Sequence, residues 1–275
     1  MKCIATDLDR TLLPNGTARA SKQALPLLKK ELATHPTLLV FVTGRYDTLI
    51  LKAIKQYRLP RPNYCIANVG TEIFTYTRGK LLPLTTWTER ISKDWKGKTR
   101  HDIAKALRNL PQLTEQEPRK LNPHKQSYYA TTWNKTLENT IRNRLDKLKI
   151  RYHLTISKDT TTGKRFLDIT PKSATKETAL NYLLKKEGIK KRDTLCCGDS
   201  GNDLTMLTSG HPAVLVKNAS DEVRNELIRL AKKKNVLRTL YFPKGIPELG
   251  LNGNYAAGIL EAAYHFGIFN KKKKH

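Results

Sequence analysis

Two aspartates lie one residue apart where the first apolar run of the chain stops. Residues Cys3 to Thr6 are typical of a short buried strand, and Asp7 and Asp9 follow at its end. Positions i and i+2 of a strand point the same way, so the two carboxylates crowd one small region. Such crowding is costly unless a cation or a shared proton relieves it. The pattern indicates a divalent-metal site or an acid/base pair, with a solvated loop of incidental charge as the alternative.

Polar side chains also follow three later apolar segments. Thr43-Gly44-Arg45 comes after one short apolar run, Lys176 opens an apolar-periodic helix after another, and Gly198 to Asp203 comes after a third. With the first pair, these segments supply a hydroxyl, an ammonium, backbone amides and four carboxylates. Parallel strands end at one edge of a sheet, and open α/β sheets bind their ligands there. We therefore expect these groups to form one site.

Taken in order, these segments resemble the four motifs of the haloacid dehalogenase superfamily, which are a DxD pair, a strand-end Thr or Ser, a Lys, and a GD followed by ND. The matching positions are Asp7, Asp9, Thr43, Lys176, Asp199 and Asp203. Within the superfamily, the chain is similar to sucrose-phosphate phosphatases of the Cof-type, or IIB, subclass. These carry phrases like those at 42–45, 68–73, 197–203 and 256–261. The similarity covers nearly the whole chain but is diffuse between about residues 84 and 160, where substrate choice would reside.

The resemblance implies a role for each of the two first acids. Asp7 would be the nucleophile that attacks phosphorus and forms an aspartyl phosphate. Asp9 would protonate the leaving alcohol and then take a proton from the attacking water. Aspartyl-phosphate ATPases of the superfamily carry Thr at the second position, and its dehalogenases lack a second Asp. The presence of Asp9 therefore favours a phosphatase or a phosphomutase.

The resemblance also implies Mg²⁺ as the cofactor. Mg²⁺ prefers hard oxygen ligands and keeps several waters, so a small set of carboxylates suffices. We expect Asp7, the carbonyl of Asp9 and Asp199 to be metal ligands, with Asp203 nearby or behind them.

Four groups are expected to bind the phosphate of the substrate. They are the hydroxyl of Thr43, the amide of Gly44, Lys176 and Asn202. In phosphoryl transfer, such positioning and charge stabilisation supply most of the catalysis. Lys172 is an alternative to Lys176, and we prefer Lys176 because its position matches the family's motif.

The order of apolar segments predicts an α/β fold with a Rossmann-like parallel sheet, the fold that the resemblance also implies. Residues 70–76 alternate like one arm of a hairpin whose turn lies at 78–80. From residue 84 the pattern changes to α+β, and the resemblance implies an inserted cap domain over the site. We predict core at 1–83, cap at 84–164, core again at 165–270, and a disordered basic tail at 271–275.

Aromatic side chains in and near the predicted cap have two possible roles. They could stack on a sugar, although packing inside the protein is the commoner role for such residues. The candidates are Trp87, Trp95, Tyr128, Tyr129 and Trp133.

The composition is that of a folded protein with a large excess of positive charge. The 275 residues include 51 Lys and Arg against 24 Asp and Glu, which gives a formal charge of +27. This charge would attract polyanions at low salt, but the basic residues are spread along the chain, so we expect no nucleic-acid partner. We find neither a signal-peptide pattern nor an apolar run of ~18 residues, so we expect no membrane span and a cytoplasmic location.

Three functions fit these patterns. The first is a Mg²⁺-dependent sugar-phosphate phosphatase, similar to a sucrose-6-phosphate phosphatase and acting as a monomer on a small-molecule substrate. The second is a phosphatase for another glycoside phosphate, such as a mannosyl or trehalose compound. The third is a non-catalytic, polyanion-binding protein of the same fold, which the charge of +27 suggests. The intact acidic set argues against the third, because an inactive scaffold has no physical need for four repelling carboxylates.

Overall fold

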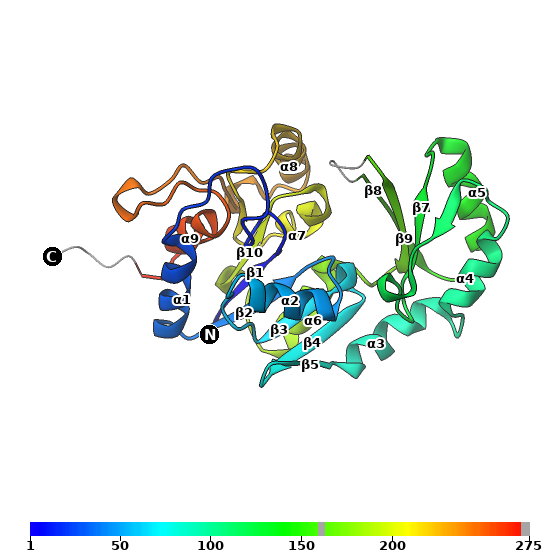
Figure 1. Ribbon diagram of the computed structural model, residues 1–275, viewed down its shortest axis with the longest axis horizontal. Helices are drawn as coiled ribbons and strands as arrows, with labels where there is room; N and C mark the ends of the chain where they lie inside the picture. Colours follow the sequence, from blue (N-terminus) through cyan, green and yellow to red (C-terminus); the bar gives the residue numbers. More distant parts are fainter. Residues whose placement is uncertain (159–162, 271–275) are drawn as a thin grey trace.

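The computed structural model describes residues 1–158 and 163–270, and the predicted disordered tail at 271–275 lies outside them. Figure 1 shows a large core with helices on both faces of a central sheet, and a smaller cap to one side of it. None of the helices in the described ranges has the length and apolar character that crossing a bilayer requires.

The core sheet confirms the predicted α/β fold. It is parallel from its first strand to β3, and its last two strands are antiparallel. These two strands form the hairpin expected around residues 70–83. The spatial order of the sheet is β12 (Leu240–Tyr241), β11 (Ala213–Leu215), β10 (Thr194–Gly198), β1 (Lys2–Thr6), β2 (Thr37–Val42), β3 (Tyr64–Ala67), β4 (Glu72–Thr77) and β5 (Lys80–Pro83).

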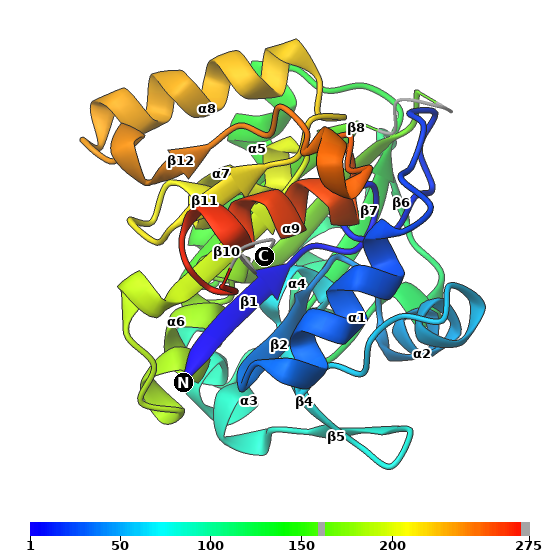
Figure 2. The same cartoon turned by 90° about the vertical axis from the view of Figure 1, so that its left-hand side faces the viewer.

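Alternating side chains of the central strands fill both faces of the sheet. Ile4 of β1 points into one apolar cluster, whereas its neighbours Cys3 and Ala5 point into the other. Helices α1 (Ala24–Thr34), α2 (Asp47–Gln56) and α9 (Ala256–His265) cover the first face, and Figure 2 shows α1 and α9 side by side across it. Helices α3 (Thr85–Ser92), α6 (Lys176–Lys186), α7 (Leu204–Leu207) and α8 (Asp221–Lys233) cover the second.

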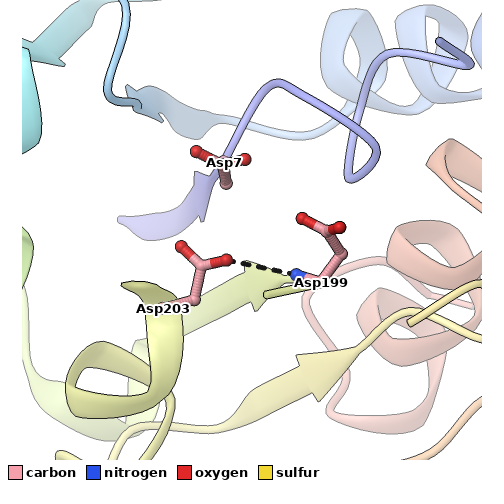
Figure 3. A group of neighbouring side chains, drawn as sticks. All are labelled: Asp7, Asp199 and Asp203. Carbon is pink, nitrogen blue, oxygen red and sulfur yellow. Dashed lines mark hydrogen bonds between the residues drawn. The ribbon is translucent and has the colours of Figure 1, made fainter. Parts of the chain in front are cut away.

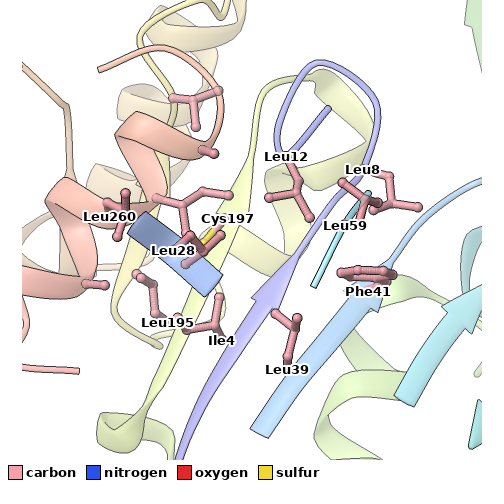
Figure 4. Close-up of a cluster of buried hydrophobic side chains, with 14 of the residues drawn as sticks. Ile4, Leu8, Leu12, Leu28, Leu39, Phe41, Leu59, Leu195, Cys197 and Leu260 are labelled. Atoms are coloured by element: carbon pink, nitrogen blue, oxygen red, sulfur yellow. The ribbon is translucent and has the colours of Figure 1, made fainter. Parts of the chain in front are cut away.

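The first apolar cluster anchors the strand that carries Asp7. Ile4 and Leu8 flank this residue in sequence, and both are completely buried. Figure 4 shows them in one cluster with Leu39, Phe41 and Leu260 from other elements. Burying each such side chain contributes roughly 1.5–3 kcal/mol, so the end of β1 is held firmly.

The cap is a two-layer α+β unit. Its antiparallel sheet has the order β6 (Leu113–Glu115), β7 (Gln126–Ala130), β9 (Arg165–Pro171) and β8 (Tyr152–Lys158). Helices α4 (Arg100–Leu107) and α5 (Lys135–Asp146) pack on the face turned away from the core (Figure 1). The apolar stripe Ile141 and Leu145 of α5 lies against Leu167 of the sheet.

Both predicted borders of the cap are wrong by one element. The border at residue 84 assigns α3 to the cap, but Trp87 and Ile91 of this helix are buried in the apolar cluster of the core. The border at residue 165 assigns β9 to the core, but this strand pairs with β7 and β8 of the cap. Neither border has a local signal, because a strand or helix pattern does not reveal which sheet it packs on.

A turn with unusual backbone angles joins β3 to β4. It comprises Asn68–Gly70, a short 3₁₀ helix labelled η1, and its last residue has φ 103°. A Cβ atom on Gly70 would lie only 2.3 Å from the carbonyl carbon of Thr175, directly before α6. Only glycine fits at this contact, through which the turn supports the start of α6.

We expect Gly70→Ala to lower the free energy of unfolding by about 2–4 kcal/mol, because it combines a backbone clash with an unfavourable φ. Chemical denaturation measures this loss. Gly79→Ala is the matched control: Gly79 has φ 80° and no atom within 4 Å of the added methyl, so it should cost only about 1 kcal/mol. Equal losses in the two variants would contradict the tight contact between η1 and α6.

Candidate active site

Three acids meet at the edge where β1 and β10 end. Asp7 follows β1, is only 5% exposed, and donates its backbone N–H to the carbonyl of Cys197 at 3.0 Å. Asp199 follows β10, and Asp203 lies in the loop after it. Figure 3 shows the three carboxylates turned toward one another. One oxygen from each lies within 4.8 Å of the others. The predicted convergence of Asp7, Asp199 and Asp203 is therefore present.

Lys176 places its ammonium among these acids. Its Nζ atom lies 2.8 Å from Asp7 Oδ1 and 2.8 Å from Asp203 Oδ1, and it donates to Asn202 Oδ1 at 3.1 Å. The side chain is 3% exposed. Lys176 is the first residue of α6, and the Thr175 hydroxyl caps this helix by accepting from the N–H of Thr178. The structure thus selects Lys176 as the lysine that meets the acidic cluster.

Asp203 organises the loop that carries Asp199. Its Oδ2 atom accepts hydrogen bonds from the backbone N–H groups of Asp199 and Ser200, both at 3.2 Å, while its Oδ1 binds Lys176. Asp199 itself accepts from the Thr11 hydroxyl at 3.0 Å and lies 3.5 Å from Nε of Arg10. Because both oxygens of Asp203 already accept hydrogen bonds, Asp203 is suited to a place behind Asp7 and Asp199.

Burial and mutual repulsion perturb the ionisation of these groups. Burial raises the pKa of Asp7 to about 8, although Lys176 opposes the rise. Burial and the charge of Asp203 raise the pKa of Asp199 to about 6. Burial alone would lower the pKa of Lys176, but Asp203 and Asp7 outweigh it and raise the pKa above its usual value. One ammonium therefore only partly neutralises the cluster.

The donor set fits Mg²⁺. Carboxylate oxygens are the hard ligands that this ion prefers, and a cation would replace the proton that burial favours on Asp7. Asp7 and Asp199 are the side chains best placed to hold it, with Asp203 behind them.

The predicted phosphate-binding residues lie beside this cluster. Thr43 directly follows β2 and is 1% exposed, and its N–H donates to the carbonyl of Ile66 at 2.8 Å. Thr43, Gly44 and Asn202 line the same cavity as Asp7. All four predicted phosphate-binding residues, including Lys176, thus lie beside Asp7.

Asp9 is oriented differently from the other acids. Its carboxylate accepts from Arg45, with Nε at 2.8 Å from Oδ2 and Nη2 at 2.6 Å from Oδ1, and from Asn15 Nδ2 at 2.7 Å. Burial acts to raise the pKa of Asp9, but the hydrogen bonds and charge of Arg45 outweigh it and hold the pKa below its usual value. Sequence reasoning did not identify this partner, although Arg45 directly follows the predicted Thr43-Gly44 pair.

A cavity of about 580 Å³ joins the core site to the cap. Of the aromatic candidates, Trp87 and Trp95 are each 1% exposed within apolar clusters, and Tyr128 is buried in the cap. The aromatic residues that line the cavity are instead Tyr46 of the core and Phe166 of the cap. Sequence reasoning missed Phe166 because it lies within a regular strand. The cap residues that line the cavity are Gln116, Lys120, Lys125, Ser157, Phe166 and Asp168.

We expect Lys176→Met to lower the free energy of unfolding by about 3 kcal/mol in EDTA at neutral pH, because it removes the ammonium group that pairs with the buried carboxylates. Urea denaturation measures this loss. The matched control is Lys172→Met, which removes an exposed lysine four residues earlier and should change stability by less than about 0.5 kcal/mol. Equal stability of the two variants would contradict the central position of Lys176.

Comparisons with known proteins identify the family of this chain. The profile of the sucrose-6F-phosphate phosphohydrolase family matches residues 1–267. A protein of Nitrosococcus oceani described as a HAD-like hydrolase is 40% identical over 96% of this chain and 71% of its own length. Sucrose-phosphatase 2 of Nicotiana tabacum is 32% identical over 96% of this chain, which spans only 59% of the tobacco protein. Mannosylfructose-phosphate phosphatase of Agrobacterium fabrum is 28% identical over 98% of both chains.

A solved structure extends the likeness to three dimensions. The sucrose-phosphatase of Synechocystis sp. PCC6803, in complex with sucrose and phosphate, superposes with a TM-score of 0.76 at 25% identity, over 98% of this chain and 99% of that one. A subclass IIB sugar phosphatase has the same fold, with a TM-score of 0.59 at 17% identity. The chain belongs to the sucrose-6F-phosphate phosphohydrolase family, a family of phosphoric monoester hydrolases with the haloacid dehalogenase fold.

Proposed function

We propose that the protein hydrolyses a sugar phosphate monoester in a Mg²⁺-dependent reaction through an aspartyl phosphate on Asp7, with a substrate like sucrose 6-phosphate. The observation that carries this proposal is the position of Asp7 beside Lys176, in a cavity that core and cap line together. A volume of about 580 Å³ lies within the usual range for small-molecule sites. The Synechocystis enzyme, which binds sucrose and phosphate, supports the same class of substrate.

The proposed reaction has two displacements at phosphorus. In the first, an oxygen of Asp7 attacks phosphorus, and the bond from phosphorus to the sugar oxygen breaks. Asp9 donates a proton to that leaving oxygen. In the second, water attacks phosphorus and gives a proton to Asp9, the acyl-phosphate P–O bond breaks, and the Asp7 carboxylate returns.

One ammonium and neutral hydrogen-bond donors would stabilise the charge on the phosphoryl oxygens. Lys176 contacts Asp7, and Thr43 and Gly44 line the same cavity, where the hydroxyl and the amide could donate to the phosphate. Mg²⁺, held by Asp7, the Asp9 carbonyl and Asp199 with Asp203 behind, would neutralise further charge there. Because the side chains of this site are held by the core sheet and α6, little reorganisation of the protein would be needed at the moment of reaction.

Asp9 must first gain a proton, and Arg45 controls this step. Arg45 keeps Asp9 ionised, yet it also lines the substrate cavity. An incoming phosphate would compete with Asp9 for the guanidinium. Loss of this partner would raise the pKa of Asp9 and allow it to act as the acid.

A second candidate is a phosphatase for another glycoside phosphate. The mannosylfructose-phosphate phosphatase of Agrobacterium favours this candidate, because the two chains match over 98% of both lengths. The cap side chains around the cavity would discriminate between the sugars, and the core chemistry would be the same.

Phosphate release from sucrose 6-phosphate, mannosylfructose phosphate, trehalose 6-phosphate and glucose 6-phosphate tests both candidates. We expect release from one disaccharide phosphate in Mg²⁺ and none in EDTA. Asp7→Asn should lower kcat on the order of 10⁴-fold or more, as loss of a nucleophile does in other enzymes. Release that persists in EDTA or in Asp7→Asn would contradict the proposed mechanism.

Asp9→Asn should lower kcat more for esters with a poor leaving group than for esters with a good one. We expect kcat to fall on the order of 10²–10⁴-fold for a sugar phosphate, whose alcohol needs a proton to leave. With p-nitrophenyl phosphate, whose phenol is far more acidic, the loss should be at least tenfold smaller. Steady-state kinetics with both esters measure the two losses, and equal losses would exclude Asp9 as the acid.

A further inference from the structure

The turn η1 has a backbone that its own sequence does not favour. Asn68, Val69 and Gly70 all have positive φ, at 48°, 56° and 103°. Asn and Gly tolerate this region, but a β-branched residue such as Val69 is an outlier there, and its cost must be offset by surrounding contacts. Such strain is found mainly at functional sites, so the contacts of η1 are informative.

One set of contacts reaches the phosphate-binding loop after β2. The N–H of Asn68 donates to the carbonyl of Arg45 at 3.0 Å, and the N–H of Val69 donates to the carbonyl of Thr43 at 3.2 Å. The Cγ1 atom of Val69 lies 3.7 Å from the position that a Cβ atom on Gly44 would occupy. The strained turn therefore fixes the backbone on both sides of Gly44 and covers this glycine with a methyl group.

A second contact reaches the helix that carries Lys176. Gly70 packs so closely on the backbone of Thr175 that no Cβ fits between them. Trp87 donates from Nε1 to the carbonyl of Gly70 at 3.0 Å and holds the turn from the other side. The loop at Thr43 and the start of α6, which carry the two parts of the proposed phosphate site, thus both contact η1.

A third set of contacts comes from the cap. Nζ of Lys125 lies 3.4 Å from Oδ1 of Asn68 and 3.7 Å from Oδ1 of Asp168 on β9. Nearby, Nδ2 of Asn122 donates to Oγ1 of Thr71 at 2.9 Å. Lys125 is 7% exposed, so its ammonium depends on these partners more than a solvated lysine would.

We propose that Lys125 is a positioning residue. Through its contact with Asn68, it makes the geometry of the phosphate site depend on the contact between cap and core. When the cap lies against the core, Lys125 fixes the position of Asn68. The turn then fixes the loop at Thr43 and the start of α6, so that the phosphate-binding groups have the positions that catalysis requires. Catalysis on any phosphate monoester then depends on Lys125, including an ester too small to need contacts from the cap. This inference rests on the proposed function.

Kinetics of Lys125→Met with p-nitrophenyl phosphate and with sucrose 6-phosphate test the coupling. We expect kcat to fall roughly tenfold for both esters, the effect of losing a hydrogen bond to a charged group. Asn68→Gly, which keeps the positive φ and removes the side chain, should give a similar loss. The double variant should be no slower than either single variant, because both substitutions remove the same contact between Lys125 and Asn68.

Two kinetic outcomes would overturn the inference. An unchanged kcat for p-nitrophenyl phosphate, with a higher KM for sucrose 6-phosphate alone, would reduce Lys125 to a sugar contact. Losses that multiply in the double variant would make the two residues independent. Lys135→Met, which removes an exposed cap lysine on α5, is the matched control and should keep wild-type rates. Unfolding midpoints identify any variant that fails to fold.

Binding of inorganic phosphate separates this inference from the proposed function. Calorimetric titration in Mg²⁺ should give several-fold weaker binding to Lys125→Met and to Asn68→Gly than to the wild type. Unchanged affinity would overturn the coupling. A wild-type protein that binds phosphate but hydrolyses neither ester would contradict the proposed function alone.

Discussion

Three carboxylates converge at the carboxyl edge of the core sheet, and the ammonium of Lys176 contacts two of them, those of Asp7 and Asp203. The pairing of β1 with β10 brings Asp7 and Asp199 together, and the packing of α6 supplies the lysine. Burial makes the remaining repulsion strong, and it raises the pKa of Asp7 to about 8. A bound cation would relieve this repulsion, so the proposed metal site draws its affinity from the same feature that destabilises the empty cluster.

Asp9 and the cap contact the core outside the acidic cluster. Asp9 is kept apart from the three acids by its bidentate contact with Arg45, which holds the pKa of Asp9 below its usual value. The strained turn at Asn68–Gly70 contacts the loop after β2, the start of α6 and, through Asn68, the cap side chain Lys125. In the proposed mechanism, both contacts would link the chemistry at Asp7 to the arrival of a substrate beneath the cap.

Local patterns predicted the core and the cluster well, because both depend on short-range signals. Apolar runs that stop at Asp7, Thr43 and Asp199 indicate strand ends, and the topology of a parallel sheet brings strand ends together. The borders of the cap and the pairing of Asp9 with Arg45 depend on tertiary packing, which leaves no periodic signal. The strand Arg165–Pro171 is recognisable in sequence, yet only its partners β7 and β8 reveal that it belongs to the cap.

Divalent-metal binding by the acidic cluster is the claim on which the other conclusions depend. Titration of the metal-free protein with Mn²⁺, followed by electron paramagnetic resonance, measures it without any substrate. The account predicts one saturable site per chain, weakened on the order of 100-fold or more in Asp199→Asn and retained in Asp168→Asn, which alters an acid of the cap. The absence of saturable binding, or equal affinity in the wild type and Asp199→Asn, would contradict it.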